Sequence, residues 1–415
     1  MLEDQLIVKP LPAAGMSAAA ISEELARIEM PEPYAHFTRA FRPPEDVQQV
    51  AKAAFQRFMS DNGFFSLYLP YMQRIEQEVI AMGVSLLHPT PTSTGNFTGG
   101  GTESNFSGVH AAREWAKVHR PNVRRPNIVA PRTIHPSFQK AARYLEVDVI
   151  TTPIDANGRG IASEIAAAIN SDTIMVAASA PTWHYANIDP IPEIAAVARE
   201  AGLWMHVDAC VGGYVSPFLE KLGVQLTPWD FRVPGVMSIS ADLHKYGYCL
   251  KPASTIFWRE AELQQYHYVA VEDEFIGTYK LAGFAGSRSA GPIFAAWAVM
   301  SYLGEEGYLR LTRRLLDLKA RLTAGINAIE GLQMWDAEVL PLQFHSTKVS
   351  TAAIYQGLAD KGWLMLGLVK PAAITLPIDP ALTDEAVDQL LRDVREVTEH
   401  LNKVGGGPDG NIRYA

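Results

Sequence analysis

The segment from Thr173 to Val207 reads TIMVAASAPTWHYANIDPIPEIAAVAREAGLWMHV and contains two short apolar runs with a helical pattern between them. The same alternation repeats over residues 125–260. It is typical of an α/β domain in which helices cover a mostly parallel sheet, and ligands of such sheets bind at the carboxyl ends of the strands. The expected strands are Asn127–Ala130, Val147–Thr151, Thr173–Ala178, Leu203–Val207, Val236–Ser240 and Thr255–Trp258, and the expected helices include Phe138–Leu145, Ser163–Ile169 and Pro192–Ala201.

Length and composition limit the classes of protein to which the chain can belong. Its 415 residues exceed the size of a single core, and a 48% apolar share with 20% charged residues is typical of a folded globular protein. The 45 acidic residues outnumber the 36 basic ones, and the formal net charge of -9 argues against a nucleic-acid partner.

Location can also be argued from composition. No run approaches the roughly 18 apolar residues of a membrane-spanning helix, and the acidic residues that follow Met1 do not resemble a secretory signal. The only two cysteines are Cys210 and Cys249, which favours a reducing compartment. We therefore expect a cytoplasmic protein without a membrane span.

The patterning divides the chain into four regions. Residues 1–60 form a Pro- and Glu-rich N-terminal arm, and residues 61–300 form the large domain, in which the apolar spacing from Gln73 to Leu86 predicts an amphipathic helix. A long helical pattern from Gly291 to Ile329 leads into a small C-terminal α/β domain, so that residues 301–402 hold the linking helix and this domain. Residues 403–415 form a flexible tail that begins with a run of glycines.

A glycine-rich turn, Thr98–Ser104 (TGGGTES), precedes a helix whose apolar face is Phe106, Val109, Ala112 and Ala116. The unpaired backbone N–H groups and the dipole of such a helix point at whatever binds there, and an anion is the natural occupant. The turn matches neither a Walker nor a dinucleotide-binding fingerprint. An ordinary tight turn without a ligand is the alternative.

Two chemically active residues follow later strands. Asp208 closes the run His206–Val207, where a buried carboxylate needs a cationic partner, although a capping role for Asp208 is the alternative. Lys245, 37 residues after Asp208, follows the next apolar run, Val236–Ser240. In that position we expect burial to lower the pKa of Lys245 and prepare its amine to form an imine, and a surface lysine is the alternative. An anion-binding turn, a carboxylate and a lysine in this order supply what pyridoxal phosphate (PLP) needs.

Five motifs resemble, in order, those of the sphingosine-phosphate lyase branch of the group II PLP-dependent decarboxylases. The resemblance covers about residues 60–330. It implies a fold-type I PLP-dependent enzyme that is an obligate homodimer with active sites shared between subunits. The motifs are Thr98–Ser104, His135–Phe138, His206–Gly213, Ser238–Tyr248 and Ala285–Arg288.

The resemblance also implies which residues contact the cofactor and the substrate. It implies no metal ligand. Lys245 would form the Schiff base, Asp208 would pair with the pyridinium nitrogen, and His135 would stack on the cofactor ring. The other predicted contacts are Gly101, Thr102, Ser240 and His244 to the cofactor, Gly286 and Ser287 to the cofactor of the neighbouring subunit, and Tyr185, Tyr248, Lys251 and Arg288 to the substrate. Alternatives are a helix-start role for His135, an interface ion pair for Arg288 and packing for Tyr248.

The motifs depart from the lyase pattern near the expected substrate site. Tyr185-Ala186 replaces a His-Gly pair, Ala282-Gly283 replaces Pro-Thr, and Phe65–Tyr68 stands where the lyases have Asn-Pro-Leu-His. The resemblance therefore leaves the substrate open between a long-chain phosphorylated amine and a smaller molecule.

The reaction class follows from the cofactor and these motifs. PLP enzymes share chemistry at Cα and differ in how the substrate is oriented. We expect a PLP-dependent carbon–carbon lyase that cleaves Cα–Cβ of a β-hydroxy amine to an aldehyde and an amine, with an L-amino-acid decarboxylase as the alternative. An aminotransferase is less favoured because residues 322–391 contain no arginine to anchor a carboxylate. A PLP-binding protein without turnover is disfavoured by the presence of Lys245, Asp208 and His135.

Overall fold

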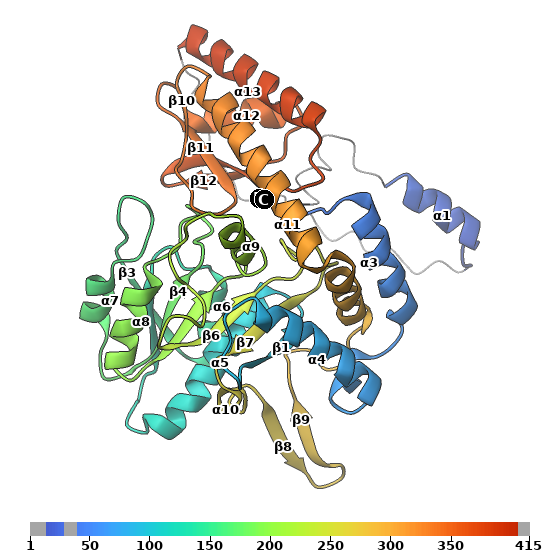
Figure 1. Ribbon diagram of the computed structural model, residues 1–415, viewed down its shortest axis with the longest axis vertical. Coiled ribbons are helices and arrows are strands. Elements are labelled where there is room, and N and C mark those ends of the chain that lie inside the picture. Colours follow the sequence, from blue (N-terminus) through green and yellow to red (C-terminus); the bar gives the residue numbers. More distant parts are fainter. Residues whose placement is uncertain (1–13, 29–39, 406–415) are drawn as a thin grey trace.

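The alternating apolar runs form a seven-stranded sheet at the centre of the larger domain (Figure 1). The structure is a computed structural model that describes residues 14–28 and 40–405. The sheet order is β1-β7-β6-β5-β4-β2-β3, and β7 runs antiparallel to both of its neighbours while the other pairs are parallel. The strands are β1 (Thr94–Thr98), β2 (Asn127–Pro131), β3 (Asp148–Thr152), β4 (Thr173–Ser179), β5 (Trp204–Asp208), β6 (Val236–Ala241) and β7 (Ser254–Trp258).

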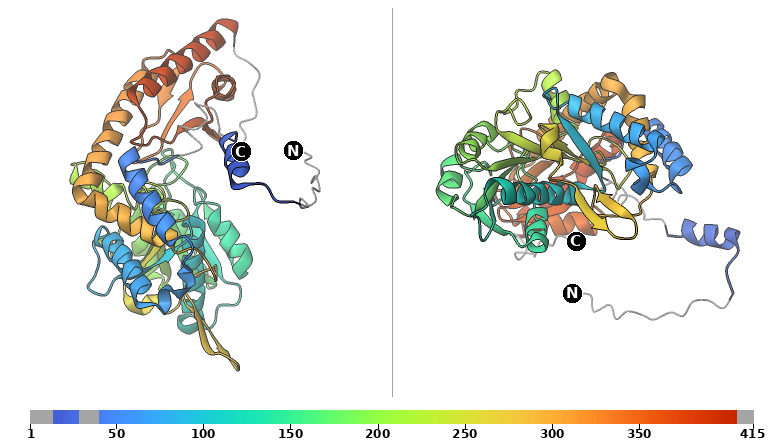
Figure 2. Two further views of the ribbon diagram at one scale, coloured as in Figure 1. Left: turned by 90° about the vertical axis from the view of Figure 1, so that its right-hand side faces the viewer. Right: turned by 90° about the horizontal axis from the view of Figure 1, so that it is seen from below.

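Helices cover both faces of this sheet (Figure 2). Helices α5 (Gly101–His119) and α6 (Ser137–Leu145) pack on one face, and α7 (Ala162–Ala168) and α8 (Ile191–Glu200) pack on the other. Because successive strand residues point to opposite faces, Ile128 and Ala130 of β2 join the core beneath α5 and α6, whereas Val129 joins the larger core that includes α8. The predicted α/β fold is confirmed.

The strands and helices expected over residues 125–260 are present within one or two residues of their predicted bounds. The amphipathic pattern around Gln73–Leu86 forms α4 (Pro70–Ser85). Strand β1 was not expected, because its sequence TGNFT holds a single large apolar residue, and its pairing with β7 stabilises it. The hairpin of β8 (Val269–Asp273) and β9 (Gly277–Leu281) was not expected either, and it projects from the large domain (Figures 1 and 2).

Helix α11 (Gly291–Asn327) runs from the large domain into the small one (Figure 1) and is interrupted at Gly304. The small domain contains an antiparallel sheet of order β10-β11-β13-β12. Helix α13 extends to Val404, so the predicted tail at 403–415 begins later than expected, and residues 406–415 lie outside the described residues. The remaining elements of this domain are β10 (Leu332–Met334), β11 (Leu342–Ser346), β12 (Leu366–Val369), β13 (Ala372–Leu376), α12 (Thr351–Asp360) and α13 (Asp384–Val404).

The predicted N-terminal arm is described in part, because residues 1–13 and 29–39 lie outside the described residues. Helix α1 (Ala18–Ala26) buries no residue. Helix α3 (Glu45–Phe58) packs on α11, where Phe58 stacks on Phe294 with ring centroids 3.7 Å apart. Across residues 14–28 and 40–405, no helix has both the length and the apolar character that crossing a bilayer requires. The short elements are η1 (Gly63–Leu67), α9 (Ser216–Lys221) and α10 (Ala261–Gln264).

Candidate active site

A cavity of about 610 Å³ opens at the carboxyl ends of β4, β5 and β6. This is the edge at which ligands of parallel sheets bind. Its polar wall includes the glycine-rich turn before α5, Asp208 at the end of β5 and Lys245 beyond β6. Its apolar rim is made of Phe41, Phe106, Tyr144, Trp183 and Phe284.

The glycine-rich turn fits closely against the sheet edge. A Cβ atom on Gly101 would lie 2.7 Å from both Asp242 Oδ2 and Cys210 Sγ, so a larger residue could not occupy this position without a shift of its neighbours. The ring of His244 lies beside the turn, since a Cβ on Gly100 would be 3.8 Å from its Cε1 atom. Gly101, Thr102 and His244 all line the cavity. The first turn of α5 therefore presents backbone N–H groups to an anion in the cavity.

Glu103 ties this turn to a loop from another part of the chain. Its Oε2 accepts a hydrogen bond from the Gly99 N–H at 2.7 Å, and its Oε1 accepts one from the Phe284 N–H at 2.8 Å. Phe284 and Ala285 consequently form part of the cavity wall of the same chain.

Asp208 is buried at the base of the cavity as the last residue of β5. Its Oδ1 accepts a hydrogen bond from the Cys210 N–H at 3.0 Å, and its Oδ2 accepts one from Asn105 Nδ2 at 3.0 Å. Burial opposes ionisation, but the His135 imidazole, the hydrogen bonds from Cys210 and the Lys245 amine hold the pKa of Asp208 below its ordinary value. A buried carboxylate that stays ionised can stabilise a cation such as a protonated ring nitrogen.

Asn105 is buried and has four polar side-chain partners, and the sequence gave no reason to predict it as a site residue. Its Nδ2 donates to Asp208 Oδ2 and to Ser137 Oγ, the latter at 2.9 Å. Its Oδ1 accepts from Ser240 Oγ at 2.7 Å and lies 3.3 Å from His206 Nε2. Asn105 therefore connects the carboxylate at the base of the cavity with the segment that carries His135.

His135 lines the cavity just before α6. Its Nδ1 accepts a hydrogen bond from the Ser137 N–H at 3.1 Å and lies 2.9 Å from Ser137 Oγ, which fixes the orientation of the ring. Burial lowers the pKa of His135, and the nearby Asp208 opposes this effect. A neutral, oriented imidazole can stack on a planar ring.

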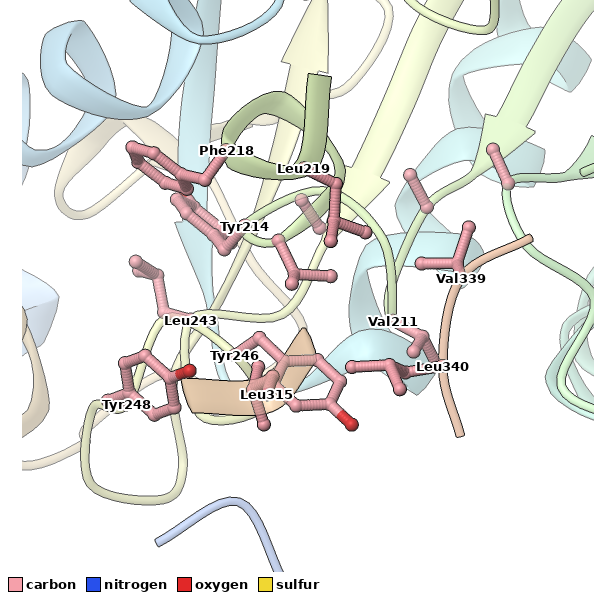
Figure 3. Packing of buried hydrophobic residues seen from close by; sticks show 14 of the residues in the cluster. Val211, Tyr214, Phe218, Leu219, Leu243, Tyr246, Tyr248, Leu315, Val339 and Leu340 are labelled. Carbon is pink, nitrogen blue, oxygen red and sulfur yellow. The ribbon is translucent and has the colours of Figure 1, made fainter. Parts of the chain in front are cut away.

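Lys245 lies in the turn after β6 and is held by its apolar neighbours. Leu243 and Tyr246 are buried in the core with Leu315 and Leu340 (Figure 3), and the Tyr246 hydroxyl donates to the Ile378 carbonyl at 3.1 Å. The Lys245 side chain is thereby directed to the cavity.

The direction of the pKa shift of Lys245 differs from the prediction. Its Nζ lies 2.9 Å from Asp242 Oδ2. Burial alone would lower the pKa of Lys245, but attraction to Asp242 outweighs burial and raises this pKa above its ordinary value. The expectation of a lowered pKa is wrong here, because the sequence did not identify Asp242 as the partner of Lys245.

Residues 35–344 match the pyridoxal-dependent decarboxylase conserved domain. The chain belongs to the pyridoxal-dependent decarboxylase family. The sphingosine-1-phosphate lyase of Arabidopsis thaliana is 36% identical over 341 residues, which cover 81% of this chain and 62% of that protein. The probable L-tyrosine/L-aspartate decarboxylase of Methanocella arvoryzae is 31% identical over 348 residues, which cover 84% of this chain and 90% of that protein. The solved structure of a Burkholderia pseudomallei sphingosine-1-phosphate lyase has a TM-score of 0.89 at 31% identity and covers 96% of this chain and 94% of that one.

Membership of this family confirms the predicted family and the predicted cofactor, PLP. The donor set of the cavity fits that group. A buried, ionised carboxylate at Asp208 suits a pyridinium nitrogen, the first turn of α5 suits a phosphate, and the amine of Lys245 suits an aldehyde.

Three predicted site residues lie elsewhere than expected, outside the lining of the cavity. Ser240 is buried behind Asp208 and donates to Asn105 Oδ1, so it does not face the cofactor. Tyr185 stacks on Trp335 of the small domain with ring centroids 5.0 Å apart. Tyr248 is buried near Tyr308, 6.1 Å between ring centroids, and packing between the two domains accounts for its position. These positions correct the predicted cofactor and substrate contacts.

Four further predicted residues also lie outside the cavity wall. Gly286 and Ser287 are exposed, and Ser287 Oγ accepts a hydrogen bond from Asn62 Nδ2 at 3.1 Å. Arg288 donates to the Gly286 carbonyl at 3.3 Å, within its own loop. Lys251 is exposed, and both desolvation and the nearby Lys245 lower its pKa. Their predicted contacts with a neighbouring cofactor or with substrate stay predictions.

Proposed function

We propose that the chain cleaves the Cα–Cβ bond of a phosphorylated β-hydroxy amine to give an aldehyde and a phosphorylated amine. The observation that carries this proposal is the convergence of Lys245, Asp208 and the first turn of α5 on one cavity. Similarity to sphingosine-1-phosphate lyases from a plant and a bacterium supports this choice of bond. The chain spans 62% of the plant relative, so the reaction is inferred from the site and the shared motifs together.

The residues around the cavity have different roles in the proposed reaction. When bound, PLP withdraws electrons from the substrate Cα. In the proposal, Lys245 holds the cofactor covalently, Asp208 keeps its ring nitrogen protonated, and His135 packs against the ring. Asn105 orients Asp208 through the 3.0 Å hydrogen bond, and Ser240 supports Asn105 from behind.

The phosphate of the cofactor belongs at the glycine-rich turn. The N–H groups of Gly101 and Thr102 and the ring of His244 supply donors on the cavity wall there. A phosphate on the substrate needs a second cationic group, and Lys251 is the candidate. Its amine lies close enough to His244 to lower the pKa of that imidazole, and Lys245 is close enough to lower the pKa of Lys251.

The rim of the cavity favours an apolar substituent on the substrate. Phe106 and Phe284 meet edge to face with ring centroids 5.2 Å apart, and Tyr144 lies 6.5 Å from Phe284. Trp183 and Phe41 complete the rim. Aromatic walls bind hydrocarbon well, which suits a substrate whose aldehyde fragment carries an alkyl chain.

We also propose that the active form is a homodimer. An exposed apolar surface surrounds η1 and the start of α4, beside the loop that carries Gly286 and Ser287. Exposed apolar patches of this kind mark protein interfaces, and a second copy would bring its loop to the neighbouring cavity. The residues of this surface are Met59, Phe65, Tyr68, Leu69 and Tyr71.

A cytoplasmic location is part of the same proposal. Cys210 and Cys249 are both free and buried, and neither belongs to a disulfide. Free thiols suit a reducing compartment.

A decarboxylase is the second candidate, supported by the similarity to a probable L-tyrosine/L-aspartate decarboxylase over 90% of its length. A screen of phosphorylated β-hydroxy amines and of amino acids, with aldehyde and carbon dioxide detected together, separates the two. Aldehyde without carbon dioxide supports the lyase. Carbon dioxide from an amino acid, without cleavage of any β-hydroxy amine, rejects it.

A further inference from the structure

A second carboxylate, Asp242, lies at the reactive amine. Asp242 follows β6 directly, is 3% exposed, and its Oδ2 lies 2.9 Å from Lys245 Nζ. Its Oδ1 accepts a hydrogen bond from Ser254 Oγ at 2.5 Å. The carboxylate therefore has one oxygen fixed by the neighbouring strand and the other directed at Lys245.

Asp242 and Asp208 differ in what they face. Both oxygens of Asp208 accept hydrogen bonds, one from Asn105 and one from Cys210. Among the residues that the structure describes, Asp242 is the carboxylate that forms an ion pair with Lys245. The other titratable groups that influence Lys245 or Asp242 come from several elements. They are Asp208 and Cys210 at the end of β5, Tyr214 beyond them, His135 before α6, and His244 and Lys251 in the turns around Lys245.

With PLP bound as proposed, Lys245 would have to leave the cofactor in each turnover. An incoming amine arrives as an ammonium ion, forms the carbon–nitrogen double bond to the cofactor carbon and displaces Lys245 Nζ from it. Two protons pass from the incoming nitrogen to the leaving one, so Lys245 ends as an ammonium ion and the total charge is unchanged. A buried ammonium ion is costly unless a carboxylate is beside it.

We propose that Asp242 is the counter-ion that receives the protonated amine of Lys245 whenever that amine is not bonded to the cofactor. The two side chains lie 2.9 Å apart, which is close enough to form this pair. Such a pair favours the exchange of Lys245 for an incoming amine, because it stabilises the product side of the exchange. The inference rests on the proposed cofactor site and is independent of which substrate bond is cleaved.

The position of Asp242 also keeps the released Lys245 side chain near the proposed cofactor site. A Cβ on Gly101 would lie 2.7 Å from Asp242 Oδ2 and 2.8 Å from Oδ1, so the carboxylate packs directly beneath the turn proposed to bind the phosphate. Lys245 paired with Asp242 therefore remains in the cavity wall and can return to the cofactor when the product leaves.

The test uses the PLP-loaded enzyme and methylamine, an amine with no bond to cleave. Borohydride reduction at increasing methylamine concentrations, followed by mass spectrometry, gives the fraction of Lys245 still bonded to the cofactor. Asp242→Asn should raise the methylamine concentration for half exchange at pH 7.5 at least tenfold, because each pKa unit lost by Lys245 changes this equilibrium tenfold. Asp230→Asn, the same change at a buried carboxylate paired with Arg232, should leave it unchanged.

A half-exchange concentration within twofold of wild type in Asp242→Asn would overturn the inference. If wild-type Lys245 never carries PLP, the proposed cofactor site itself fails, which is a separate result. Ser254→Ala, which frees Asp242 without removing its charge, should move the equilibrium in the same direction by a smaller factor.

A second measurement needs no cofactor. Reductive ¹³C-methylation of the empty enzyme and NMR titration of the Lys245 signal, assigned by its loss in Lys245→Ala, should give a pKa at least one unit lower in Asp242→Asn than in wild type. An unchanged Lys245 pKa would contradict the proposal, even if Asp242→Asn loads PLP poorly.

Discussion

Replacing Asn105 by leucine should weaken PLP binding beyond its effect on the fold. Leucine is larger than asparagine but branches at the same carbon, and it removes the hydrogen bond from Asn105 Nδ2 to Asp208 Oδ2 at 3.0 Å. A hydrogen bond to a charged group contributes about 1.5–3 kcal/mol, and the buried partner is left unsatisfied. The other partners of Asn105 are Ser137, His206 and Ser240. They keep hydrogen bonds to His135, Ser238 and Asp208, respectively.

The main effect of Asn105→Leu is therefore that Asp208 loses a hydrogen bond, and the pKa of Asp208 should rise. We expect the free energy of unfolding to fall by about 2–4 kcal/mol. We expect the Kd for PLP to rise by roughly 10- to 100-fold, since about 1.4 kcal/mol corresponds to a factor of ten. Urea unfolding of the empty enzyme gives the first quantity, and titration of the cofactor absorbance gives the second.

The matched control is Asn187→Leu. Asn187 is also buried, donates to the Asn157 carbonyl and accepts from the Glu338 N–H, both at 3.0 Å, but it does not line the cavity. It should lose comparable stability while the Kd for PLP stays within twofold of wild type. If Asn105→Leu also keeps its Kd within twofold, the role assigned to Asn105 in orienting Asp208 is refuted.

Three further outcomes are expected. Asp208→Asn should keep the fold and lose roughly 10²–10³-fold in turnover, a range typical for one electrostatic group, and wild-type turnover would reject its pairing with the cofactor. Mixing Lys245→Ala with a variant disrupted at Gly286 and Ser287 should restore roughly a quarter of wild-type activity through heterodimers with one intact site, whereas a mixture that stays inactive after confirmed subunit exchange would exclude shared sites. Burial raises the pKa of Asp189 to about 7, so its contribution to stability is present in acid and is lost as pH rises through 7. The free energy of unfolding of the wild type should therefore fall by up to about 4 kcal/mol between pH 4 and 8, and Asp189→Asn should abolish this fall. If the free energy of unfolding of Asp189→Asn keeps the wild-type dependence on pH, Asp189 is not the cause of that dependence.

The sequence predicted the core of the large domain because its strands are buried on both faces and appear as apolar runs. It did not predict β1, whose five residues TGNFT depend on the backbone of β7 for their order. Nor did it predict the exposed β8–β9 hairpin, in which no residue is buried. Tertiary pairing, rather than local pattern, decides both.

The site was predictable to the extent that its residues follow strand ends or glycine turns. Asp208, Lys245 and Gly101 lie at such points, and the fold brings them to one cavity. Asn105 gave no signal, because its partner Asp208 is 103 residues away and only the packing of α5 on the sheet joins them. Asp242 lies three residues before Lys245, a spacing that was visible but had no meaning until the turn placed the two side chains 2.9 Å apart.

The predicted roles of Tyr185 and Tyr248 differ from the structure for a related reason. Both are aromatic residues close in sequence to the motifs, and both pack instead at the junction with the small domain, against Trp335 and near Tyr308. Contacts between domains leave no local pattern in the sequence. Trp183, two residues before Tyr185, lines the cavity in its place.

We propose that Lys245 holds PLP covalently in the cavity at the sheet edge. Borohydride reduction of the PLP-loaded enzyme, followed by proteolysis and mass spectrometry, tests it directly. We expect the reduced cofactor on the peptide that contains His244-Lys245-Tyr246 and no covalent labelling in Lys245→Ala. Labelling of Lys251 or any other lysine, or unchanged labelling in Lys245→Ala, would contradict it.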